Sequence, residues 1–219
     1  MTRRLFSRLV SGLALSLAAV TSATALAADS VSLPAPDTGL AAPLVSALQA
    51  RHSTRAFSPE PLAAKHLSML FWSALGVNRP DGRRVSPTAL NRQEIEAYLI
   101  TEKGAWRYDA ARHALQPVTE KSLLPLIAGT QKRSQPYVMT APTAILFTGD
   151  TRKLPADRAG TTAATDAGLA AQGALLYCAA ADLACVPRTT MDGAALQEAL
   201  GLEPGVFPLL NVIAGHPVR

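Results

Sequence analysis

Residues 163–183 read AATDAGLAAQGALLYCAAADL, the longest helical pattern in this chain of 219 residues. The pattern is rich in alanine and apolar on most of its faces, which is typical of a helix at the centre of a domain. Residues 184–187, ACVP, follow directly and predict a short strand near Cys185–Pro187. We therefore expect a domain in which one central helix packs against a sheet.

On both sides of this helix, segments whose apolar residues recur every two positions, as in strands, are followed by segments with helical spacing. From Ile95 apolar and other residues alternate, and Lys103-Gly104 turns the chain, which predicts a β-hairpin. The further expected elements are a buried strand at 143–147, a last strand at 207–214, and short helices at 120–128, 131–139 and 193–200. Because strands and helices alternate without repeats, the order predicts an α+β sandwich.

The N-terminal half predicts two helices and a long loop. Leu40, Leu44, Val45 and Leu48 recur at helical spacing, so we expect a helix over 40–51. A second helix is expected to begin at a Ser58 cap and to end at Gly76. Residues 77–92 are rich in Pro, Gly, Arg and Asn, and loops of that length in compact domains are usually functional or disordered.

The first 27 residues have the pattern of an export signal. Arg3, Arg4 and Arg8 flank the start of a short apolar run, and Ala25-Leu26-Ala27 is a typical cleavage site. The pair Arg3-Arg4 resembles a twin-arginine signal, so we predict a periplasmic protein. An ordinary secretory signal and an uncleaved membrane anchor are the alternatives. The predicted organisation is a signal at 1–27, a linker at 28–39 and one domain at 40–219.

The charge of the chain argues against nucleic-acid binding. The formal net charge is +5, but removing Arg3, Arg4 and Arg8 from the 21 basic residues leaves 18 against 16 acidic ones, a charge of +2. A nearly neutral surface attracts a polyanion weakly.

Several kinds of chemistry lack their usual motifs in this sequence. No G-x-G, P-loop or G-x-S-x-G pattern occurs, and the four histidines are scattered without metal-ligand spacing. Cys178 and Cys185 are expected to be two buried thiols, with a disulfide as the alternative. We therefore predict no metal site and no protein nucleophile.

The stretch RHSTRAF at residues 51–57 concentrates donors for an anionic group. Arg51 and Arg55 offer guanidinium groups that fork onto phosphate oxygens, and Ser53 adds a hydroxyl. Two further stretches share this polar character: SPTALNRQ at 86–93, in the long loop, and VPRTTMD at 186–192, after the central helix.

Taken together and in this order, these motifs resemble the FMN-dependent nitroreductase family over roughly residues 43–217. The first stretch is similar to the family's R-[RH]-S-x-[RK]-x-F opening, and the second to its P-S-x-x-N-x-Q-P loop. The segment FWSALGVNRPDG at 71–82 resembles the compact branch related to SagB-type dehydrogenases. The resemblance implies a nitroreductase-like sandwich with a central, mostly antiparallel sheet flanked by helices, and a homodimer with FMN bound in two shared sites.

The resemblance also implies roles for particular residues. Arg51, His52, Ser53 and Arg55 match positions that hold the flavin's phosphate, ribityl chain and pyrimidine end. The loop that reaches a flavin across the dimer interface matches Pro87, Thr88, Ala89 and Asn91, and the segment beside the flavin ring matches Pro187, Thr189 and Thr190. Arg219 is expected to replace a basic residue of the family's C-terminal extension.

The chain departs from the family's pattern at two further places. Glu94 stands where the family often has proline, and Arg188 precedes the threonines that replace acidic or glycine residues. Arg188 is therefore expected to affect the shape of the pocket.

The function implied is that of an exported oxidoreductase. Flavin carries the redox chemistry and the protein supplies binding and orientation, so we assign no catalytic residue. Small electron-poor acceptors such as nitroaromatics or quinones are expected, with an undetermined small-molecule donor and weak turnover of NAD(P)H. The alternatives are a SagB-like dehydrogenase that oxidises a modified peptide or small molecule, and a flavin- or ligand-binding protein without turnover.

Overall fold

The computed structural model describes residues 29–218. The predicted export signal at 1–27 and the predicted cofactor residue Arg219 lie outside the described residues. Within the described range, no helix combines the length and the apolar character needed to cross a membrane.

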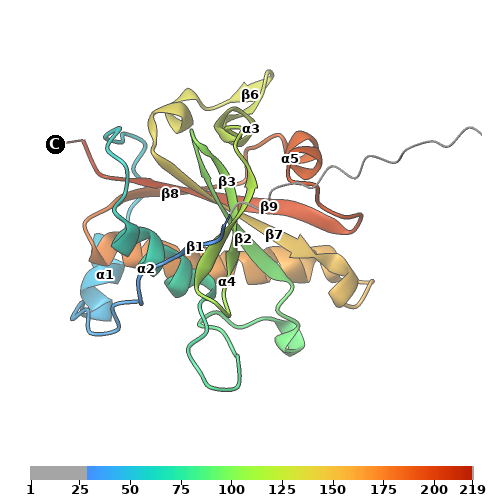
Figure 1. The fold of residues 1–219 in the computed structure, drawn as a ribbon, viewed down its shortest axis with the longest axis horizontal. Coiled ribbons are helices and arrows are strands. Elements are labelled where there is room, and N and C mark those ends of the chain that lie inside the picture. Colours follow the sequence, from blue (N-terminus) through green and yellow to red (C-terminus); the bar gives the residue numbers. More distant parts are fainter. Residues whose placement is uncertain (1–28, 219) are drawn as a thin grey trace, which may run out of the picture.

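A seven-stranded sheet organises the fold, and each described pair of neighbouring strands is antiparallel (Figure 1). The strands are β1 (Val31–Ser32), β2 (Ile95–Thr101), β3 (Gly104–Asp109), β4 (Ala114–Thr119), β7 (Thr143–Asp150), β8 (Ala184–Arg188) and β9 (Val206–Gly215). Their order across the sheet is β1-β4-β3-β2-β7-β9-β8. Two short strands, β5 (Gly129–Thr130) and β6 (Arg133–Ser134), form a separate hairpin. The predicted α+β class and antiparallel sheet are confirmed.

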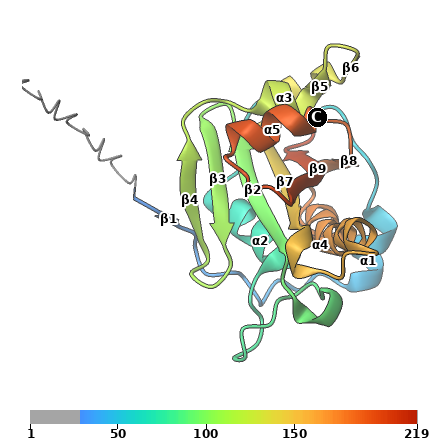
Figure 2. The same ribbon diagram turned by 90° about the vertical axis from the view of Figure 1, so that its right-hand side faces the viewer.

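Helices cover both faces of this sheet. The helices are α1 (Leu44–Ala50), α2 (Ala64–Leu75), α3 (Leu124–Ala128), α4 (Ala159–Ala180) and α5 (Gly193–Ala199), with 3-10 turns at Ala89–Asn91, Pro136–Thr140 and Thr151–Lys153. Figure 2 shows α3 and α5 together at one end of the view and α1, α2 and α4 away from them. The predicted hairpin, the 143–147 strand, the last strand and the central helix are all confirmed, with shifted bounds.

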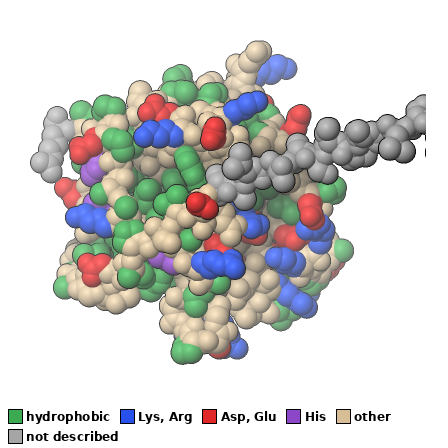
Figure 3. Space-filling model, viewed as in Figure 1, with side chains coloured by type: hydrophobic (Ala, Val, Ile, Leu, Met, Phe, Trp, Pro, Cys, Tyr) green, Lys and Arg blue, Asp and Glu red, His purple; other side chains and the backbone are tan. Residues whose placement is uncertain are grey.

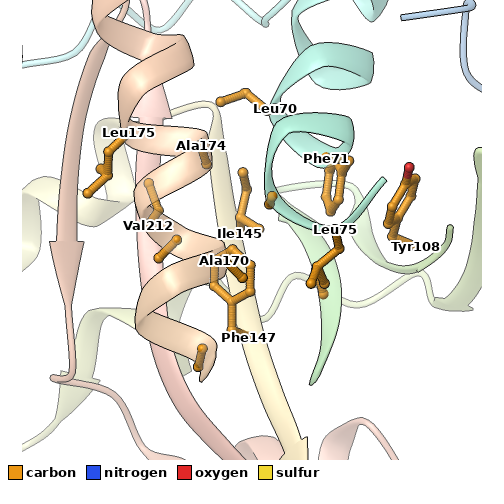
Figure 4. Packing of buried hydrophobic residues seen from close by; sticks show 14 of the residues in the cluster. Leu70, Phe71, Leu75, Tyr108, Ile145, Phe147, Ala170, Ala174, Leu175 and Val212 are labelled. Atoms are coloured by element: carbon orange, nitrogen blue, oxygen red, sulfur yellow. The ribbon is translucent and has the colours of Figure 1, made fainter. Parts of the chain in front are cut away.

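Alternation along the strands divides the core into two layers. On β7, Ile145 and Phe147 join the cluster that includes α2 and α4, whereas Leu146 joins the cluster with α3 and α5. This follows from the period of two along a strand, which sends successive side chains to opposite faces. Figure 4 shows Ala170 and Ala174 of α4 beside the β7 side chains.

Small residues let α4 approach its neighbours closely. A methyl group on Gly173 would lie 2.0 Å from the carbonyl oxygen of Ser73 in α2, so the crossing of the two helices requires glycine there. The buried side of α4 is apolar apart from Asp166, whereas its exposed side carries Thr161, Thr165 and Gln172.

Apart from these shifted bounds, four features differ from the sequence-based prediction. The helix expected at 131–139 is instead the short strand β6 followed by the 3-10 turn Pro136–Thr140. Helix α2 begins at Ala64 rather than after Ser58, because Pro59 and Pro61 disfavour helical backbone in the residues before them. Strand β4 was not predicted, because Pro117 interrupts its pattern. The expected linker at 28–39 contains β1, which pairs with the first two residues of β4 at the edge of the sheet.

Candidate functional site

The RHSTRAF segment lies along the edge strand β8 and the end of β9. The Thr54 N–H donates to the Cys185 carbonyl (2.8 Å), and the Ser58 N–H donates to the His216 carbonyl (2.9 Å). Arg51 ends α1, with its N–H donating to the Ala47 carbonyl at 3.0 Å. Backbone hydrogen bonds therefore hold the segment against the sheet and leave its side chains available.

The donor side chains of this segment are open to solvent. His52, Ser53 and Arg55 are exposed, and Arg51 is half-buried. Within residues 29–218, the guanidinium groups of Arg51 and Arg55 and the Ser53 hydroxyl have neither a hydrogen-bond partner nor an ion-pair partner. His52 Nδ1 lies 2.7 Å from the Ala50 carbonyl oxygen. Two cations and a hydroxyl without internal partners fit an external anion such as a phosphate.

The two cysteines lie beneath this segment. Cys178 and Cys185 are buried and free, which confirms the favoured prediction. A hydrogen bond with Cys178 lowers the pKa of the Cys185 thiol, and the charge of Arg51 lowers it further. The guanidinium of Arg51 therefore lies close enough to β8 to affect its side chains.

The segment at 186–192 is only partly exposed. Pro187 and Thr189 are exposed and Thr190 is half-buried. Arg188 instead turns into the protein, where its side chain is 7% exposed and its guanidinium lies over the ring of Tyr137. The guanidinium of Arg188 donates to Gln135 Oε1 (2.8 Å), the Ile127 carbonyl (2.9 Å), Asn211 Oδ1 (3.0 Å) and the Ala128 carbonyl (3.3 Å). Because its guanidinium is bonded in the interior, Arg188 is not available as a direct ligand group, and its effect on the shape of the pocket stays a prediction.

The loop at 86–93 has an unusual backbone and lies against α4. Leu90, Asn91 and Gln93 have φ angles of 53°, 52° and 49°, which non-glycine residues rarely adopt. The Ala89 N–H donates to Asp166 Oδ2 at 2.8 Å, and the Gln93 N–H donates to Thr88 Oγ1 at 2.9 Å. Pro87 and Asn91 are exposed.

Within one chain, the structure brings two of the three motifs together. Residues 51–55 and 187–190 both lie at β8, near the C-terminal end of α4. The 86–93 loop contacts α4 at Asp166, and the helix rises roughly 18 Å between Asp166 and Cys178 at 1.5 Å per residue. One subunit therefore places the loop away from the two motifs at β8.

Two features of this region were missed from the sequence. His66 Nδ1 lies 2.8 Å from the Tyr177 hydroxyl, and both His66 and His216 line a cavity of about 670 Å³ beside Phe57 and Ser58. Burial is the main cause of a lowered pKa at His66. Across residues 29–218, no three His, Cys, Asp or Glu side chains are grouped to hold a metal ion.

The second missed feature is a buried carboxyl pair at the end of the 86–93 loop. Glu94 is fully buried, and its pKa is raised to about 7, first by burial and then by the neighbouring Asp166 carboxyl. The departure from the family's proline at this position was the available sequence signal. The contact between Glu94 and Asp166 could not be predicted from the sequence, because Asp166 belongs to a helix distant in the chain.

Comparison with known proteins gives a consistent result. A model of the nitroreductase family matches residues 48–216. A candidate nitroreductase from Ralstonia eutropha JMP134 is 31% identical, with a TM-score of 0.80 over 89% of this chain and 92% of that chain. A search of curated proteins finds no match.

Two more distant structures share the fold. A candidate nitroreductase from Desulfovibrio desulfuricans, solved in complex with FMN, has 20% identity and a TM-score of 0.60 over 81% of this chain and 87% of that chain. The E. coli microcin synthetase McbBCD complex, with truncated pro-MccB17 bound, has 17% identity and a TM-score of 0.65 over 80% and 73%.

Proposed function

This chain belongs to the nitroreductase family, and from that premise we propose that it is an FMN-dependent oxidoreductase acting on small electron-poor acceptors of the nitroaromatic or quinone type. The observation that carries the proposal is the set of side chains at Arg51, Ser53 and Arg55. These groups have no internal partner in the described part of the chain and lie beside the exposed residues of β8.

The residues at β8 fit FMN by the chemistry of their donors. Arg51, His52 and Ser53 would hold the phosphate and ribityl chain, and Arg55 would place a positive charge at the pyrimidine end. Pro187 and Thr189 would border the ring system. Bound FMN supplies the hydride-transfer chemistry, and the protein binds and orients the reactants.

A second subunit would complete the site. α1 exposes Leu44, Val45 and Leu48 (63%, 65% and 50% exposed), and the adjacent α4 exposes Leu169 (46%). Such a group of exposed apolar side chains is typical of a protein interface. A homodimer formed through these helices would bring Pro87, Thr88, Ala89 and Asn91 of one chain to the flavin bound at β8 of the other.

Export to the periplasm is part of the same proposal and rests on the sequence pattern at 1–27. NAD(P)H is a cytoplasmic pool, so an exported enzyme would take its electrons from another donor. The acidic and basic side chains on the face in Figure 3 are interspersed, so the surface offers no single-sign patch to guide a charged protein donor there.

The decisive test is cofactor retention by the purified protein. We expect absorption bands at about 370 and 450 nm, as flavin gives. Arg51→Ala and Arg55→Ala should each weaken FMN binding by about 10- to 100-fold, because each removes a charge-assisted hydrogen bond. Titration of flavin fluorescence measures the dissociation constant.

Arg158→Ala is the matched control, because Arg158 is exposed and its ion-pair contact in the described structure is a 3.7 Å approach to Asp157. It should leave FMN affinity unchanged. Equal affinity in all four proteins would refute the site. A protein that shows no flavin bands after FMN is added would instead support a binding role without flavin.

A further inference from the structure

The loop at 86–93 has a strained backbone conformation, which hydrogen bonds within the loop and to α4 hold in place. Three of its residues, Leu90, Asn91 and Gln93, have positive φ angles although each carries a Cβ atom. This conformation has a free-energy cost and persists where the surrounding structure imposes it. Leu90 is also 76% exposed, so its own side chain contributes little packing.

Asp166 of α4 supplies the shortest hydrogen bond between the loop and this helix. Its Oδ2 accepts the Ala89 N–H at 2.8 Å, directly before the residues with positive φ. Asp166 is only 6% exposed, so its carboxylate is largely removed from water. The hydrogen bond from Ala89 to α4 therefore depends on one buried carboxyl group, and the Ser86 hydroxyl adds a longer bond of 3.5 Å to the Leu169 carbonyl.

Glu94 places a second carboxyl group beside Asp166. Glu94 is 0% exposed, and within residues 29–218 no donor reaches either of its carboxylate oxygens. A buried carboxylate without a donor is strongly unfavourable, and two carboxylates in contact cannot both be ionised at low cost. A proton on Glu94, donated in a hydrogen bond to Asp166, resolves both difficulties.

The other charged groups around Glu94 do not neutralise it. Lys153 lowers its pKa, but burial, the largest cause, raises it by more. Arg84 acts on Glu94 without an ion pair, and its Nη1 donates to the Ile95 carbonyl at 2.8 Å. Asp150 contributes a backbone N–H to the Glu94 carbonyl, not to its carboxyl group.

We propose that Glu94 and Asp166 share one proton, and that this protonated pair is a positioning device that holds the strained 86–93 loop on α4. For its effect on cofactor binding the proposal rests on the proposed function, in which this loop contributes to the flavin site. The existence of the carboxyl pair and its effect on the loop do not depend on that function, because both are argued from contacts within a single chain.

The direction of the pH dependence follows from proton linkage. In the held loop the pKa of Glu94 is about 7, whereas a Glu94 released into water has an ordinary pKa near 4.5. The held state therefore binds more protons between these two values. Protonation of Glu94 therefore stabilises the held loop over the released loop. This stabilisation is complete below about pH 4.5, decreases as the pH rises to about 7, and changes little above that.

The first experiment measures the loop without cofactor. Hydrogen exchange of peptides covering 86–93, normalised to the intrinsic rate, should become about tenfold faster between pH 5 and pH 7, within the limit of tenfold per pH unit for one proton. Glu94→Gln keeps the shape and a donor but cannot ionise, so its exchange should not depend on pH. Glu102→Gln, at an exposed position beyond the other end of β2, is the matched control and should behave as wild type.

A second variant separates proton sharing from simple packing. Asp166→Asn retains an oxygen that can accept the Ala89 N–H but removes the negative neighbour of Glu94. The midpoint of the pH effect should move to lower pH. An unchanged midpoint in Asp166→Asn, or the same pH profile in Glu94→Gln and wild type, would overturn the proposal.

The second experiment measures FMN affinity over the same pH range. The phosphate of FMN has its own ionisation near pH 6, which affects all variants equally and cancels in a ratio. The ratio of the wild-type to the Glu94→Gln dissociation constant should rise by about tenfold from pH 5 to pH 7. A constant ratio contradicts the link between the pair and the site.

The two proposals fail in different ways. If no variant binds FMN while exchange of the loop still depends on Glu94, the proposed function is wrong and the carboxyl pair stands. If FMN binds to all variants and exchange does not depend on Glu94, the proposed function stands and the carboxyl pair is wrong.

Discussion

At the scale of single residues, the direction of a side chain decides what it can bind. Arg55 and Arg188 both belong to motifs of the predicted flavin site. Arg55 is exposed, whereas Arg188 is 7% exposed and donates to two backbone carbonyls and two side-chain oxygens. Arg188 therefore stabilises the link between β8 and α3, and Arg55 remains available to a ligand.

We expect Arg188→Met to destabilise the fold. The substitution keeps much of the apolar stem but removes the donor to the buried Ile127 carbonyl and to Asn211 Oδ1, at a cost of about 2–4 kcal/mol. Urea denaturation gives the free energy of unfolding. Arg158→Met, at an exposed position, should change it by less than about 0.5 kcal/mol, and an equally small effect of Arg188→Met would show that the buried bonds contribute nothing net.

The candidate site was predictable where its residues are contiguous. Residues 51–57 carry their donors within one short segment, and the structure leaves most of them exposed, although their role in FMN binding stays a prediction. The Glu94–Asp166 pair was not predictable, because its members belong to a loop and to a distant helix. Folding of the chain brings these two residues into contact, and their spacing in the sequence does not predict that contact.

At the scale of elements, apolar periodicity predicted the long members of the fold well. β2, β7, β9 and α4 all have sustained patterns, and each is found near its expected position. β1 and β4 are short or contain proline, so tertiary pairing rather than local propensity determines them. Pro59 and Pro61, rather than a Ser58 cap, set the start of α2 at Ala64.

The crossing of α2 and α4 gives a prediction at this scale. Gly173→Ala should lower the free energy of unfolding by about 1–3 kcal/mol, because its methyl group would meet the Ser73 carbonyl oxygen at 2.0 Å and force the helices apart. Gly160→Ala is the control in the same helix, since a methyl group there would meet nothing within 4 Å.

Thermal unfolding of the two alanine variants makes the comparison. Gly160→Ala should be neutral or slightly stabilising, because alanine favours helix over glycine. A Gly173→Ala variant as stable as Gly160→Ala would show that the helices separate at no cost.

At the scale of the whole molecule, a single chain contains all the motifs of the proposed flavin site but does not bring them into one place. The motifs at β8 follow the C-terminal end of α4, the 86–93 loop contacts the same helix about three turns away at Asp166, and the exposed apolar residues of α1 lie beside that helix. The proposed homodimer explains both observations, because a second copy would cover the apolar residues and supply the missing loop.

Val45→Glu tests this assembly. A buried unpaired charge at an interface costs about 2–5 kcal/mol, so the variant should elute as a monomer and bind FMN at least about tenfold more weakly. Light scattering after size exclusion measures the mass. The control is Val118→Glu, at an exposed position on β4. A wild-type monomer that retains FMN would contradict the proposal.

The sequence by itself determined the fold class, the central helix and the family, because hydrophobic periodicity and contiguous motifs are local properties of the chain. Only the tertiary structure decided that Arg188 is internal and that Glu94 meets Asp166. It also decided that the 86–93 loop lies away from the motifs at β8. These properties depend on which face of an element a side chain occupies and on contacts between distant segments, and packing of the complete domain sets both.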